Sequence, residues 1–185
     1  MSIQVTVLGV AKAKARIKMI RAKTDNAVKA ELETIGNDLT RYIVEQKLSG
    51  TLLKRRTGNL ARSIHPKREG LTERVFTNSI YARVHEYSGD IRPVNKKWLT
   101  IPTEAALTPA GVLRAPAPAW TGLWFELDGP GRASLWQRQN GKPVKIFDLR
   151  KKVHIPERSY LRSSLRENKT QIINRLQGAV KRAMA

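Results

Sequence analysis

The sequence predicts an α+β domain in which a long N-terminal helix and a C-terminal helix pack on one face of an antiparallel sheet of about four to six strands. Three patterns lead to this class: a helical apolar stripe near the N-terminus, alternating segments in the middle, and a second helical stripe near the C-terminus. The chain has 185 residues, enough for one compact domain, and 41% of them are hydrophobic.

The N-terminal region divides at residue 24. Residues 3–8 alternate like a short strand, and residues 10–23 are rich in helix formers, with six cations and no acid. Two interpretations of this arm stay open: a basic helix, formed alone or on binding, and a solvated, frayed terminus. Residues 24–26 can cap a helix that runs to about residue 48. We therefore expect a basic strand and arm over residues 1–23, followed by a single α+β domain over residues 24–185.

The long helix is predicted by apolar residues that recur every three or four positions from Val28 to Ile43, with Gln46 as the polar last member. After it, the period changes to two. Residues 60–65 and 73–77 are expected to pair as strands around a turn at residues 69–70, and residues 80–87 to form a short helix.

A proline-containing segment interrupts the second half of the chain. Residues 103–122 hold three prolines among Ala and Gly, which predicts an extended loop. Asn140-Gly141 is a strong hairpin signal. The remaining expected elements are strands at 98–102, 134–138, 144–149 and 153–156, a turn at 128–131, and a helix over about 159–182.

Charge says more about partners than about fold. There are 35 Lys and Arg against 15 Asp and Glu, a formal net charge of +20. Such a charge favours nucleic acid, an anionic membrane or an acidic protein as a partner. The chain has no apolar run long enough to span a bilayer and no N-terminal secretory pattern, so we expect a protein made and used in the cytoplasm, with no membrane partner.

Enzyme signatures are missing from the sequence. It has no cysteine, no phosphate-binding loop and no nucleophile elbow, and its three histidines are far apart. Glu86 and Asp90 are close in sequence, but two acids near a turn are more often a solvated cap than a metal site. We therefore predict no enzymatic activity, catalytic residue, metal or cofactor.

The cations fall in blocks. Each block alone could be solvated surface, but together they suggest a shared surface for a polyanion, with backbone contacts to a duplex. Arg158, Arg162 and Arg166 continue this series at a spacing that predicts one helical face. The candidate DNA-facing residues are Lys12, Lys14, Arg16, Lys18, Arg21, Lys23, Lys54, Arg55, Arg56, Arg150, Lys151 and Lys152.

Three segments, in order, resemble the tail-completion or neck family of long-tailed bacteriophages, in its Mu-like virion-morphogenesis or minor tail protein branch. Residues 57–64 read Thr-Gly-Asn-Leu-Ala-Arg-Ser-Ile, residues 80–89 resemble the family's Tyr-Ala-x-x-x-Glu-x-Gly pattern with one extra residue, and residues 155–161 match its Ile-Pro-x-Arg-x-Tyr-Leu. Arg56 replaces a frequent proline, and residues 103–140 are longer than a minimal member needs. The motif residues are Thr57, Gly58, Leu60, Ser63, Tyr81, Glu86, Gly89, Pro156, Arg158, Tyr160 and Leu161.

The resemblance implies a structural virion protein of the head–tail junction, assembled in the host cytoplasm. It implies a homo-oligomeric ring, with a hexamer as a candidate, around the path of the viral DNA. The implied neighbours are neck and tail proteins such as the connector, the tail terminator or the tail tube. The residues themselves also allow a structural role for the motif: Gly58 permits a tight turn, and Pro156 sets the entry of the last helix. The alternative function is a free-standing, basic nucleic-acid-binding protein.

Overall fold

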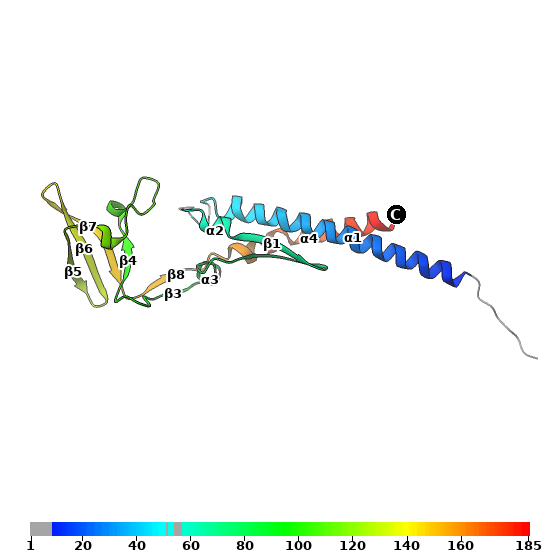
Figure 1. Cartoon of the computed structure of the whole chain (residues 1–185), viewed down its shortest axis with the longest axis horizontal. Coiled ribbons are helices and arrows are strands. Elements are labelled where there is room, and N and C mark those ends of the chain that lie inside the picture. The colour runs from blue at the N-terminus through cyan, green and yellow to red at the C-terminus, as the bar shows by residue number, and fades with distance from the viewer. Residues whose placement is uncertain (1–8, 51, 54–56) are drawn as a thin grey trace, which may run out of the picture. The chain divides into compact units, whose positions relative to one another are not determined.

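The computed structural model describes residues 9–50, 52–53 and 57–185. Its contacts divide the chain into two compact units, each assembled from separate stretches. The α+β class, the two long helices and the antiparallel pairing of strands are confirmed (Figure 1). Among the described residues, the strands are distributed over sheets of two, two and four strands. Unit 1 contains residues 9–47, 63–78 and 161–185, and unit 2 contains residues 48–62 and 79–160, apart from the positions left undescribed.

Helix α1 spans Val10–Tyr42 and continues as a π-helical turn, η1, over Ile43–Lys47. The predicted start at residue 24 is wrong, because the helix formers at residues 10–23 extend the same helix back to Gly9, whose φ is 88°. Of the two interpretations of the arm, the helix is therefore the one observed. The predicted strand at residues 3–8 lies outside the described residues.

The apolar stripe of α1 packs in its C-terminal half. Ile35 and Ile43 are buried, and Val28 and Leu32 are half-buried. The hairpin of β1 (Ile64–Glu69) and β2 (Thr72–Thr77) lies against this helix.

Gly36 of α1 faces the Glu73 side chain on β2. A Cβ at this position would lie 2.5 Å from Oε1 and 2.8 Å from Cγ of Glu73, so a larger residue would require that flexible side chain to move. Burial raises the pKa of Glu73.

The expected strand at residues 60–65 is only partly correct, because helical turn α2 (Asn59–Arg62) precedes β1.

Helix α4 spans Tyr160–Met184, and its part in unit 1 runs antiparallel to α1 (Figure 1). Side-chain bonds across the pair fix this direction. Glu167, early in α4, accepts hydrogen bonds from Tyr42 and Lys47 at 2.7 Å. Arg182, near the end of α4, lies 3.4 Å from Glu31. Leu165 of α4 is exposed.

Unit 2 contains the four-stranded sheet, in the order β4-β7-β6-β5. Asn140 and Gly141 form the turn between β6 and β7 as predicted, with φ values of 51° and 80° that suit a type I′ hairpin. The strand at residues 123–129 was not predicted. The four strands are β4 (Leu99–Pro102), β5 (Leu123–Gly129), β6 (Arg132–Gln139) and β7 (Lys142–Arg150).

The expected loop at residues 103–122 packs on this sheet through two short 3-10 turns, η2 (Glu104–Ala106) and η3 (Ala117–Ala119). Trp120 contacts Phe147 edge to face at 5.9 Å between ring centroids. The remaining elements of unit 2 are α3 (Ala82–Tyr87), β3 (Gly89–Ile91) and β8 (Val153–Ile155).

Candidate assembly site and basic surfaces

The second and third motif segments meet at a short antiparallel ladder. Gly89 of β3 pairs with Ile155 of β8. Just beyond the ladder, the backbone N–H of Arg158 donates to the carbonyl of His85 at 2.8 Å. A Cβ at Gly89 would lie 3.1 Å from Cγ2 of Val84, so this glycine allows α3 to turn tightly into β3. Segments that are far apart in the sequence therefore form one local framework.

The Arg158 side chain extends this framework toward the first motif segment, because its Nη1 donates to the carbonyl of Leu52 at 3.1 Å. Gly58 has a φ of 75°, which favours glycine, and the Arg62 backbone N–H donates to its carbonyl at 3.0 Å. Nη2 of Arg62 donates to the carbonyl of Thr57 at 3.1 Å. The predicted tight turn at Gly58 is confirmed, although it opens α2 and not a strand.

Glu86 and Tyr160 form the buried centre of this region. Glu86 is 3% exposed and Tyr160 is fully buried. Burial, and secondarily the charge of Glu86, raise the pKa of Tyr160 to about 12. Tyr160 therefore keeps its proton at neutral pH. The expectation that Glu86 is a solvated cap is wrong, because α3 places its side chain inside unit 2, whereas Asp90 is exposed.

His85 lies beside this centre. Burial, followed by the charge of Arg158, lowers the pKa of His85, so the imidazole is neutral at physiological pH. Its Nδ1 atom is buried and has no hydrogen-bond partner within the described part of the chain. His85 is thus a partly buried, packed side chain.

Exposed apolar side chains lie at the two ends of α3. Ile80 and Tyr81 directly precede the helix and Tyr87 is its last residue; we name these three residues the α3 patch, and Tyr81 is 62% exposed. Its exposure means that Tyr81, a motif residue, does not pack within unit 2. Among the other motif residues, Thr57 and Pro156 are exposed, Leu60 and Leu161 are half-buried, and Ser63 shares a 2.7 Å hydrogen bond with Thr77 in unit 1.

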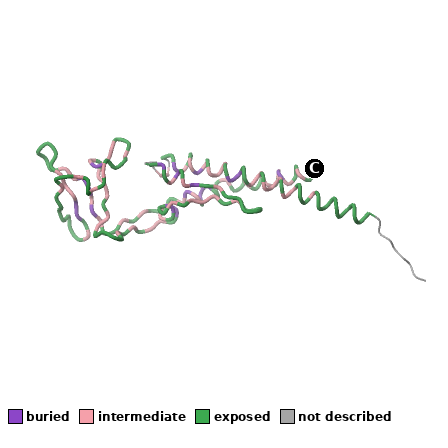
Figure 2. Tube along the Cα trace, in the orientation of Figure 1, coloured by how far each residue is buried: buried purple, intermediate pink, exposed green. Residues whose placement is uncertain are grey.

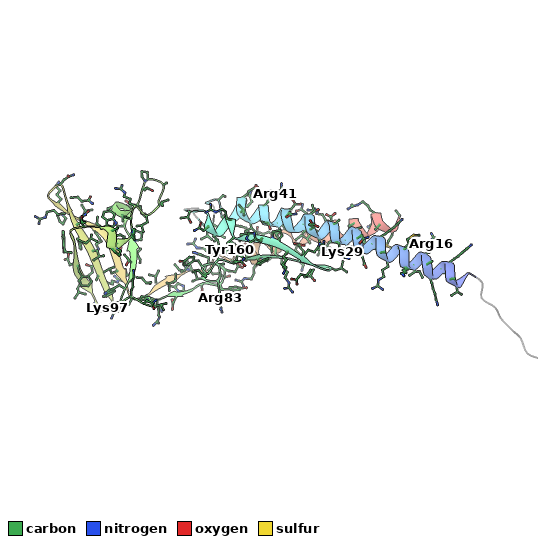
Figure 3. The ribbon with its side chains drawn as sticks, in the orientation of Figure 1. Arg16, Lys29, Arg41, Arg83, Lys97 and Tyr160 are labelled. Carbon is green, nitrogen blue, oxygen red and sulfur yellow. The ribbon has the colours of Figure 1, made fainter. Side chains whose placement is uncertain are left out.

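One basic surface is the N-terminal half of α1, which carries six cations. Figure 2 shows this half as exposed, and Figure 3 shows Arg16 projecting from it. No ion pair joins any of its six cations to another described residue. The structure places Lys12, Lys14, Arg16, Lys18, Arg21 and Lys23 on one helix, which is one of the two interpretations of the arm that the sequence left open.

The other two blocks differ from the arm. Lys54, Arg55 and Arg56 lie outside the described residues. At the end of β7, Lys152 forms a 2.7 Å ion pair with Asp90, and the Lys151 ammonium lies 5.7 Å from the centre of the Trp98 ring. Part of the Arg150–Lys152 charge is therefore already engaged within unit 2.

The prediction that Arg158, Arg162 and Arg166 share one helical face is wrong, since α4 begins at Tyr160 and Arg158 precedes it. Sequence reasoning also missed Arg175, which bonds Glu31 at 2.7 Å and Asp38 at 2.8 Å across the helix pair. A signal was present: the two acids are seven residues apart on α1, as are Arg175 and Arg182 on α4, and this spacing keeps side chains on one face.

Within the described part of the chain, no three His, Cys, Asp or Glu residues are grouped so that they could hold a metal ion. Of the described helices, none combines the length and the hydropathy that a membrane crossing requires. Neither protein-family models, nor curated proteins, nor solved structures match this chain. No relative therefore assigns a role to any of its residues.

Proposed function

We propose that the chain is a structural subunit of the head–tail junction of a long-tailed bacteriophage, and that it assembles as a homo-oligomeric ring around the DNA path. The observation that carries this proposal is the convergence of the second and third resembling segments in unit 2. Gly89 pairs with Ile155, and Arg158 bonds both His85 and the Leu52 carbonyl. Residues that resemble one family in sequence thus also contact one another in the fold, as the parts of one functional or structural unit would.

The α3 patch supplies a contact surface for such a ring. Tyrosine is enriched at protein interfaces because it offers apolar area together with a polar hydroxyl. Glu86 of α3 is buried in unit 2, so this helix is anchored while the patch residues at its two ends remain exposed. In a closed ring, such a patch meets a different surface of the next copy.

The charge supports a polyanionic environment for the assembled protein. With a net charge of +20, the surface favours DNA along the lumen or an acidic neighbouring ring. Contacts with phosphate position a protein without reading bases, which suits a subunit that lets DNA pass.

A second function, a free-standing nucleic-acid-binding protein, is favoured by one observation: the six cations of the α1 arm have no ion pair among the described residues. It predicts a monomer that binds duplex DNA through the arm. Its affinity would fall steeply with salt, with a slope that grows by about one for each phosphate contact.

Light scattering and negative-stain imaging of the full chain, alone and with tail tubes, test the proposal. We expect rings, and we expect Tyr81→Ser to weaken them. Val94→Ser is the matched control, because Val94 is 93% exposed but lies outside the α3 patch and every helix and strand. Equal effects of the two substitutions would contradict the proposed role of the patch, and a strict monomer under both conditions would contradict the ring and favour the second function.

A further inference from the structure

The apolar stripe of α1 continues toward the N-terminus beyond the part of the helix that packs against other elements. Val10, Ile17, Val28 and Ile35 follow one another at spacings of 7, 11 and 7 residues, which return to nearly the same side of a helix. Ile35 is buried, whereas Ile17 is 67% exposed. The N-terminal half of the helix therefore displays a continuation of the stripe that forms the core in its C-terminal half.

This exposed half begins where the partner helix ends. Lys23 and Ala27 of α1 line the same shallow groove as Ala183 and Ala185 at the end of α4. Figure 1 shows the first turns of α1 extending beyond that point, and Figure 2 shows the same turns as exposed. No described residue packs on the stripe at Val10 and Ile17 in the way that α4 and the hairpin cover Ile35.

Two rows of cations flank the exposed stripe. With about 100° per residue, Lys14, Lys18 and Arg21 fall along one side of it and Lys12, Arg16 and Lys23 along the other. An apolar seam bordered by charges is the arrangement through which helices select partners of opposite charge.

We propose that the N-terminal half of α1 is a docking helix for an acidic amphipathic helix of a partner protein. The partner would place apolar residues against Val10, Ile17 and Ile20 and carboxylates against the two cation rows. Contact with DNA backbone alone would leave Ile17 in water, so the seam favours protein over nucleic acid. A second copy of this arm is disfavoured, because pairing would bring six cations of each copy together.

The inference names a partner for the proposed assembly subunit and in that sense rests on the proposed function. Its test needs only the purified full chain. A result against the partner helix leaves the ring imaging unaffected, and a monomeric chain can still bind the helix, so the two failures are distinguishable.

The probe is a peptide of about three heptads with leucine at the a and d positions and glutamate at e and g, compared with a scrambled peptide of identical composition. Fluorescence anisotropy at about 150 mM salt measures both affinities. We expect the amphipathic peptide to bind about tenfold more tightly than the scrambled one. Equal affinities would overturn the proposal, because they would show that charge alone is recognised.

Ile17→Ser and Met19→Ser form a matched pair. Both residues are exposed, at 67% and 59%, but they are two positions apart and so lie on nearly opposite sides of the helix. We expect Ile17→Ser to abolish most of the preference for the amphipathic peptide and Met19→Ser to leave it unchanged, with equal helix content by circular dichroism.

Three further outcomes count against the proposal. The first is an equal loss of peptide binding in the two variants. The second is a duplex DNA that competes fully with the amphipathic peptide and loses affinity equally in both variants, which would assign the arm to nucleic acid. The third is self-association of the unmodified chain that Ile17→Ser alone removes, which would assign the stripe to a second copy.

Discussion

The two halves of α1 differ in what surrounds the same kind of stripe. In the C-terminal half, Ile35 and Ile43 are buried, and the acids Glu31 and Asp38 are bonded to Arg175. In the N-terminal half, Ile17 is exposed, and none of the six cations forms an ion pair with another described residue. One half builds unit 1, and the other is free to meet a partner. The difference shows that a helical pattern alone does not tell a core face from a contact face.

Unit 2 repeats the contrast within the resembling motifs. Tyr160 is buried beside Glu86, whereas Tyr81 points outward in the α3 patch. Both are tyrosines of the same set of motifs, yet one stabilises the framework and the other is available to a neighbour.

The largest expected effect is a difference in the free energy of unfolding between substitutions in the two halves of the apolar stripe. We expect Ile43→Ala to lower the free energy of unfolding by about 2–5 kcal/mol, because it removes buried methyl and methylene groups and leaves a cavity. Ile17→Ala should change it by less than about 0.5 kcal/mol, since that side chain is exposed. Chemical denaturation measures both. Similar losses for the two variants would show that the N-terminal half is packed after all.

Substitutions of Tyr160 and Tyr81 should differ in how they change the stability of the protein at alkaline pH. The folded protein holds the Tyr160 proton more tightly than the unfolded chain, since its pKa is raised from 10.0 to about 12. The associated stability is therefore present below pH 10 and is lost as the pH rises through 12, a change on the order of 2 kcal/mol. Unfolding at a series of pH values should show a flatter profile for Tyr160→Phe than for Tyr81→Phe. Identical profiles would place Tyr160 in water.

We expect Arg175 and Arg16 to differ in how much they contribute to stability, because only Arg175 has acidic partners. Arg175→Met leaves Glu31 and Asp38 without their bridging cation, and we expect a loss of about 1–2 kcal/mol, reduced by solvent screening because Asp38 is partly exposed. Arg16→Met should change stability by less than about 0.5 kcal/mol. Denaturation in low and high salt measures the difference. A larger loss for Arg16→Met would refute the assignment of the arm to a surface role.

The smallest effect should appear in acid. The hydrogen bond from Arg175 is the main cause that lowers the pKa of Asp38 below 3.8. A lowered pKa stabilises the folded state above 3.8, and this contribution is lost as the pH falls through the folded value. The stability of the unmodified chain should therefore fall more between about pH 5 and pH 2 than that of Asp38→Asn. Parallel acid profiles would contradict the pairing.

Local chemistry explains which elements were predictable. Asn140-Gly141 adopts the positive φ values that its residue types favour, so the hairpin follows from two neighbours in sequence. The stripe from Val28 to Ile43 likewise follows from spacing alone. By contrast, residues 24–26 looked like a helix start, yet they lie inside α1, because capping residues are tolerated within a helix when good helix formers precede them. Strand β5 was missed because its apolar residues do not alternate and are largely exposed.

The resemblance named Glu86, Arg158 and Tyr160 as motif residues but gave no arrangement for them. Only the structure showed that β3 and β8 pair the two segments to which these residues belong. The burial of Glu86 could not be predicted, since a carboxylate is normally solvated and only the surrounding unit decides otherwise.

By itself, the sequence determined the α+β class, the net charge of +20, the absence of cysteine and the helical stripe of α1, because each depends on composition or on neighbours along the chain. The tertiary structure alone decided where that stripe is covered. Burial depends on which segments far apart in sequence pack together, and α4 and the β1–β2 hairpin cover Ile35 but not Ile17. For that physical reason one continuous pattern serves as a core in one half of the helix and as a contact surface in the other.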